Sequence, residues 1–92
     1  MLFFINKSNP SLIKRLALAG GDEDKILLLV GDGVCFAAEY WQKQFEALNV
    51  EEIYAEEEAI EARNIAVSDT CETVSYARIA DILFDNEQVV SL

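Results

Sequence analysis

Short apolar runs alternate along this chain with longer stretches of amphipathic sequence. The apolar runs predict five strands, at residues 2–5, 25–30, 52–55, 73–76 and 88–92. The second run holds consecutive apolar residues from Ile26 to Val30 with no alternation. Such a run is typical of a strand that is buried on both faces of a parallel sheet.

The sequence between these runs predicts helices. The segments are residues 11–19, a long helix from Asp32 or Gly33 to Leu48, a short acidic helix or turn at 56–63, and residues 77–84. Residues 64–72 read as a loop and residues 85–87 as a turn. Alternating strands and helices predict an α/β fold, a three-layer α/β/α sandwich around a mainly parallel five-stranded sheet. At this length we expect residues 1–92 to form a single domain.

Charge narrows the range of partners. The chain carries seventeen acidic and seven basic residues, for a net charge of −10. Direct binding to nucleic acid needs Lys and Arg against phosphates, so this balance argues against it. The longest apolar run is too short to span a membrane, and no basic segment precedes the first one as in a signal peptide. We therefore expect a cytoplasmic protein without membrane contact. Its hydrophobic content of 52% suggests an oligomer.

The absence of histidine removes several classes of chemistry. Ser-His and Cys-His nucleophile systems and the common zinc ligand sets all need it. The sequence also lacks a glycine-lysine phosphate loop and a dinucleotide-binding glycine motif. We expect no metal and no cofactor. Two cysteines are too few for a disulfide framework.

Cys35 is the first candidate for chemistry. Its predicted place just inside the N-terminus of a helix favours the thiolate, which is the form that attacks or carries sulfur. Against this, Asp32 and Glu39 are near in sequence, and a free cysteine is most often a small buried hydrophobe. Cys71 lies in the predicted loop, where an incidental residue is the simpler interpretation and a reactive or bridging thiol the alternative. Whether the two cysteines form a disulfide depends on their distance and stays open.

Three further features have a structural and a functional interpretation. Asp32-Gly33 follows a buried strand and resembles a phosphate-binding turn, but an Asp cap and a glycine turn explain it more simply. Phe36 and Tyr40 are four residues apart on the predicted helix, away from its core stripe, and either pack in the outer layer or, as we predict, form an interface with another chain. The acidic run at 51–61 is either a solvated face or a docking site for a basic partner.

In the order of these motifs, the chain resembles the small sulfur-relay proteins of the DsrH or TusB family. Five segments carry the resemblance: Phe-Ile-Asn-Lys-Ser at 4–8, the leucine run with Asp-Gly-Val at 27–38, the acidic segment with Glu-Ala-Arg at 54–63, Val-Ser-Tyr-Ala at 74–77, and the closing residues 89–92. The chain departs from the family in two places. The predicted helix at 11–19 has no cysteine near Arg15, where some members carry one, and Cys35 stands where relatives often have an aromatic or small residue.

The resemblance implies a DsrE-like fold and a cytoplasmic role in passing persulfide sulfur between proteins. It also implies assembly with DsrE/TusD-like and DsrF/TusC-like subunits, the first of which carries the sulfur. The sulfur would end in 2-thiouridine at the tRNA wobble position or in dissimilatory sulfur oxidation. Three hypotheses follow. The chain is an accessory subunit of such an assembly, a sulfur carrier that uses Cys35, or a stand-alone α/β binding protein that forms homo-oligomers.

Overall fold

The computed structural model describes residues 1–86 and 88–92, and it places five strands in one sheet. The strands are β1 (Leu2–Ile5), β2 (Lys25–Leu29), β3 (Val50–Glu56), β4 (Cys71–Val74) and β5 (Val89–Ser91). The helices are α1 (Leu12–Gly20), the 3-10 helix η1 (Gly31–Ala37), α2 (Glu39–Ala47), α3 (Glu57–Arg63) and α4 (Tyr76–Asp85). The turn expected at 85–87 includes Glu87, which lies outside the described residues.

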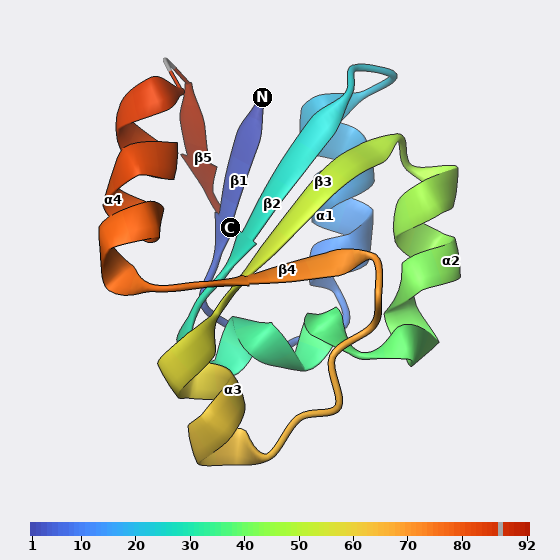
Figure 1. Cartoon of the computed structure of the whole chain (residues 1–92). Helices are drawn as coiled ribbons and strands as arrows, with labels where there is room; N and C mark the ends of the chain where they lie inside the picture. Colours follow the sequence, from blue (N-terminus) through green and yellow to red (C-terminus); the bar gives the residue numbers. More distant parts are fainter. Residues whose placement is uncertain (87) are drawn as a thin grey trace.

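The sheet is parallel throughout, in the order β4-β3-β2-β1-β5 (Figure 1). The leucine strand β2 lies at its centre, and Leu27, Leu28 and Leu29 are each 0% exposed. This confirms the prediction of a strand buried on both faces.

Helices cover both faces of the sheet unequally. Residues of α1, η1, α2 and α3 pack in one core cluster, whereas Ile79 and Ile82 of α4 pack with Leu2 and Leu28 in a second. Successive connections from β1 to β4 advance across the sheet in one direction, and right-handed crossovers therefore place their helices on one face. The return from β4 to β5 reverses direction and places α4 on the other face. The predicted α/β class and three layers are confirmed, with α4 as the whole of one outer layer.

The predicted long helix from residue 32 to 48 is wrong, because the chain breaks at Ala38. Ala38 has extended backbone angles (φ −69°, ψ 152°) between η1 and α2. Donors outside η1 form hydrogen bonds to the backbone carbonyls at this break. The Gln42 side chain donates to the Phe36 and Ala38 carbonyls at 3.1 and 2.9 Å, and the Ser68 amide donates to the Ala37 carbonyl at 2.9 Å. These bonds replace those of a continuous helix.

Smaller differences occur at β3 and β4. β3 extends beyond the predicted 52–55 at both ends, and β4 begins at Cys71 rather than Thr73. Tyr76 opens α4 instead of ending a strand. The reason is local, because the Ser75 side chain accepts the Arg78 amide at 3.4 Å and so caps α4.

Lys25, the first residue of β2, has a fully buried side chain (0% exposed). Its Nζ donates to the carbonyls of Gly21, Glu23 and Leu48 at 2.8, 3.0 and 2.6 Å. The lysine thus joins the end of α1 to the end of α2. The sequence places it beside an acidic turn and gives no sign of its burial.

Candidate functional site

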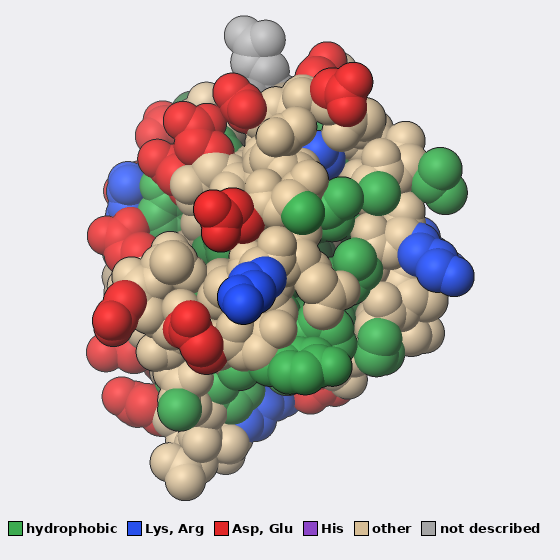
Figure 2. Space-filling model, turned by 90° about the vertical axis from the view of Figure 1, so that its right-hand side faces the viewer, with side chains coloured by type: hydrophobic (Ala, Val, Ile, Leu, Met, Phe, Trp, Pro, Cys, Tyr) green, Lys and Arg blue, Asp and Glu red, His purple; other side chains and the backbone are tan. Residues whose placement is uncertain are grey.

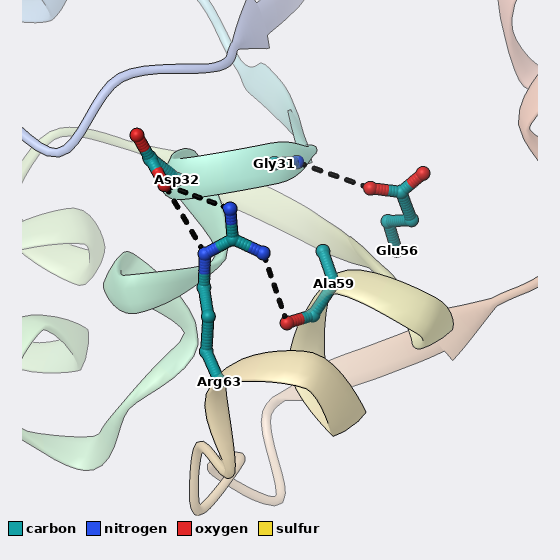
Figure 3. A network of polar contacts seen from close by, with 5 residues as sticks. All are labelled: Gly31, Asp32, Glu56, Ala59 and Arg63. Carbon is teal, nitrogen blue, oxygen red and sulfur yellow. Dashed lines mark hydrogen bonds and ion pairs between the residues drawn. The ribbon is translucent and has the colours of Figure 1, made fainter.

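The carboxyl edge of a parallel sheet is where open α/β folds place their sites. Here the ends of β2 and β3 are joined by Glu56, a carboxylate that is only 8% exposed. It accepts the Gly31 amide at 3.0 Å (Figure 3). Gly31 has a φ of +51°, a conformation that glycine adopts without strain, and its amide points to β3 rather than into η1.

An ion pair lies beside this bond. Arg63 of α3 donates from Nε and Nη2 to Oδ1 of Asp32 at 3.2 and 2.8 Å, and from Nη1 to the Ala59 carbonyl at 3.3 Å (Figure 3). The Asp32 side chain is 67% exposed, so the pair contributes about 1 kcal/mol or less to folding. Asp32 therefore fixes η1 to α3 and does not cap a helix, which corrects that part of the structural interpretation.

Gly33 is needed for close packing. A Cβ at this position would collide with the Ile5 carbonyl at the end of β1. Its φ is not positive, unlike that of Gly31, so the reason is space rather than backbone conformation. The Asp32-Gly33 turn thus has structural contacts on both sides, which explain both residues without a phosphate.

Cys35 lies half-buried in the second half of η1. It is not at a helix N-terminus as the sequence suggested, since its carbonyl accepts the Ala38 amide at 3.4 Å, where η1 ends. Burial raises the pKa of its thiol above the ordinary value, and the negative charge of Asp32 raises it further. Both causes act against the Cys35 thiolate, and a role as sulfur carrier stays a prediction.

Cys71 opens β4 and belongs to a polar cluster that the sequence did not reveal. Its Sγ donates to the Ala37 carbonyl at 3.6 Å and to Oε1 of Gln42 at 3.7 Å. Thr70 donates to the same Oε1 at 2.9 Å. Burial raises the pKa of the Cys71 thiol, against a smaller lowering by its bond to Thr70. Both cysteines are free thiols.

This polar cluster fastens the loop before β4 to the break between η1 and α2. Ser68, in that loop, donates to Glu39 of α2 at 2.6 Å. Short polar residues separated by apolar ones in 64–72 read as an ordinary loop, so no local pattern could have shown which helix they reach.

Phe36 and Tyr40 do not share a surface, which corrects the predicted pair. Phe36 is 1% exposed, and its ring lies edge-on to Trp41 and Phe45 with centroids 5.0 and 6.1 Å apart. The break at Ala38 rotates α2 relative to η1, so the spacing of four residues no longer aligns the two side chains. Tyr40 is 76% exposed and stays the predicted interface residue.

Tyr76 and Glu56 interact near the carboxyl ends of β4 and β3, where the covering helices change from one face of the sheet to the other. The helices after β3 and β4 lie on opposite faces of the sheet, and such a switch point is the usual place of a site. A hydrogen bond to Glu56 raises the pKa of the Tyr76 phenol, and the charges of Glu56 and Glu58 raise it further.

The described residues contain neither a group of metal ligands nor a membrane-spanning helix. Within residues 1–86 and 88–92, no group of three or more His, Cys, Asp or Glu residues is arranged to hold a metal ion. Over the same residues, no helix has the length and apolar character needed to cross a membrane.

Fold and site together define a small all-parallel α/β fold with structural polar contacts at the carboxyl edge of its sheet. Comparison with known proteins gives its family. The model of the DsrH-like protein family matches residues 8–89, and the chain belongs to this family. Among solved structures it is similar to the ychN protein from E. coli. The TM-score is 0.72 at 16% identity, with 99% of this chain and 97% of that chain covered, which shows a shared fold. No match is found among curated protein sequences.

Proposed function

We propose that this chain is an accessory subunit of a cytoplasmic persulfide sulfur-relay complex, with DsrE/TusD-like and DsrF/TusC-like partners. The sulfur would feed tRNA wobble-uridine 2-thiolation or dissimilatory sulfur oxidation, without direct contact between this chain and nucleic acid. Membership of the DsrH-like family carries the proposal, because that family indicates a sulfur-relay subunit in general.

The state of the two thiols supports an accessory rather than a carrier role. A persulfide carrier needs a thiolate, which neighbouring cations or a helix N-terminus provide. Burial raises the pKa of both Cys35 and Cys71, and the charge that acts on Cys35 comes from Asp32, a carboxylate. The sulfur would therefore be held on a partner subunit, with this chain completing the assembly.

Co-expression tests the assembly. The chain is produced with the DsrE-like and DsrF-like proteins of its own genome, and the complex is isolated through a tag on the DsrE-like protein. We expect all three chains in fixed ratio. A homogeneous homo-oligomer of this chain, with neither relative bound, would favour the stand-alone binding protein instead. Tyr40→Asp should weaken co-assembly while leaving the circular dichroism of the isolated chain unchanged.

Persulfide transfer tests the role of the cysteines. The complex is assembled with Cys35→Ser, with Cys71→Ser, and with the two combined, and is loaded with radioactive sulfur by a cysteine desulfurase. We expect unchanged transfer in all three. Loss of label in the Cys35→Ser complex, with assembly intact, would identify Cys35 as a carrier and overturn the accessory role.

A further inference from the structure

A groove lies between α2, the first half of β3 and the loop before β4. Its volume is about 270 Å³, and its walls are Gln42, Phe45, Glu46, Val50, Glu51, Ile53 and Thr70. A second hollow of about 150 Å³ continues around the edge of β3 and shares Glu51, Ile53 and Thr70 with the first. Figure 1 shows β4 crossing β3 at a steep angle on this side of the molecule.

The strand register explains why the groove is open. β4 pairs with β3 only from Ile53 onward, so the preceding residues of β3 have a neighbouring strand on the β2 side alone. Within that stretch Val50 pairs with Lys25 and Glu52 with Ile26, which leaves Glu51 as an extra residue. Bulges of this kind redirect side chains at sheet edges, and Glu51 lines both hollows.

The charge of the groove is uniformly negative. Glu46 and Glu51 line the larger hollow over the apolar side chains of Phe45, Val50 and Ile53, and neither hollow has a Lys or Arg wall. Among the described residues neither carboxylate takes part in an ion pair. Figure 2, which views the α2 side, shows acidic side chains along its left border and top, and hydrophobic ones towards the middle together with a Lys or Arg side chain.

The smaller hollow differs because one of its carboxylates already has a hydrogen-bond partner within the chain. Glu52 accepts the Tyr54 hydroxyl at 2.8 Å, and the Arg78 guanidinium lies 5.9 Å from the centre of the Tyr54 ring. In the larger hollow, by contrast, neither Glu46 nor Glu51 takes part in an ion pair with a described residue.

We infer that the larger hollow binds one arginine side chain from a basic segment of a partner protein. Its volume is below the ~300–1,000 Å³ of small-molecule and cofactor sites, so it suits a single long side chain. The aliphatic stem would pack on Phe45 and Val50, and the planar guanidinium would donate to Glu46 and Glu51. A nucleic acid would be repelled, and a second copy of this chain brings a net charge of −10 against the same surface.

This inference does not rest on the sulfur-relay proposal. A chain without relay partners would still bind arginine in the groove. A chain that assembles with its relatives but leaves the groove empty would fail this inference alone.

A titration of the ¹⁵N-labelled full chain tests it, with N-acetyl-arginine amide as the probe and N-acetyl-citrulline amide as its neutral control. We expect shifts of the backbone amides of Phe45, Val50, Glu51 and Ile53 with the arginine derivative only. Replacing both Glu46→Gln and Glu51→Gln should weaken binding about five- to tenfold, as for two partly exposed charge pairs. Tighter binding of free L-arginine than of the amide would instead mark a metabolite site and overturn the assignment.

A matched variant separates the groove from general attraction to an acidic protein. Asp22→Asn with Glu23→Gln removes the same charge from an exposed turn, and we expect less than a twofold effect. Equal weakening by both variants would refute the inference, as would shifts centred on α3. Self-association of the unliganded chain that disappears with the Glu46/Glu51 variant would make the occupant a second copy and also refute it.

Discussion

The buried Lys25 gives the sharpest test of how this fold is held together. Lys25→Met keeps most of the apolar volume of the side chain and removes the ammonium group. Three backbone carbonyls, those of Gly21, Glu23 and Leu48, then lose their donor. The Lys25 side chain is fully buried between the ends of α1 and α2, and methionine offers these carbonyls no donor.

Two opposing effects set the change in the free energy of unfolding that Lys25→Met causes. Releasing a buried ammonium from a low-dielectric site is favourable, and replacing a buried charge with an apolar group can therefore stabilise a protein. Here, however, the partners stay in place, and a buried carbonyl without a donor costs about 1–3 kcal/mol. The three bonds are only part-buried, and Gly21 and Glu23 are exposed residues, so water replaces part of what is lost and we expect a total loss of about 1–3 kcal/mol. That is a large share of the roughly 5–15 kcal/mol typical of a folded domain.

Urea unfolding followed by circular dichroism measures this loss. We expect a lower midpoint for Lys25→Met at an unchanged slope, whereas Lys43→Met, at an exposed position of α2, should stay within about 0.5 kcal/mol of the parent. A Lys25→Met protein as stable as the parent would show that burial of the ammonium costs as much as its hydrogen bonds provide. That result would refute the reasoning.

Three further predictions follow from the carboxyl edge and the tyrosines. Gly33→Ala should lower the free energy of unfolding by about 1–3 kcal/mol, measured in urea, because a Cβ would overlap a backbone carbonyl of β1. Cys35 has a raised pKa, so its thiol should be alkylated by iodoacetamide more slowly in the folded than in the urea-unfolded chain below about pH 9. Asp32→Asn should speed its alkylation, with Cys71 in the same sample as the control. The pKa of Tyr54 is raised chiefly by its hydrogen bond to Glu52, so Glu52→Gln should shift the ultraviolet titration of that phenol to lower pH. An unshifted titration would contradict the assigned bond. Since the raised pKa favours the protonated phenol in the folded state, the stability from this bond is full below the pKa of the unfolded chain and falls as pH rises through the folded pKa.

The sheet could be predicted from the sequence because its causes are local. Five unbroken apolar residues mark a strand covered on both faces, and the alternation of elements then requires crossovers of one hand. The helix break at Ala38 could not be predicted in this way. It depends on Gln42 and on the Ser68 amide, thirty residues along the chain, which satisfy the carbonyls that the break releases. The spacing of apolar residues alone continues across such a break and predicts one helix. The mistaken pairing of Phe36 with Tyr40 followed from that prediction.

The same break changes the meaning of the segment that carries the family resemblance. Residues 27–38 suggested a reactive thiol at a helix start, but each distinctive residue there has a structural contact. Gly31 donates to Glu56, Asp32 accepts from Arg63, and Gly33 lies against the β1 backbone. A motif explained so fully by the close approach of β1, η1 and α3 specifies a fold rather than a reaction. The features that we propose for function are therefore on the surface, at Tyr40 and in the acidic groove beside β3, where this chain would meet its partners, while the carrier role of Cys35 stays a prediction.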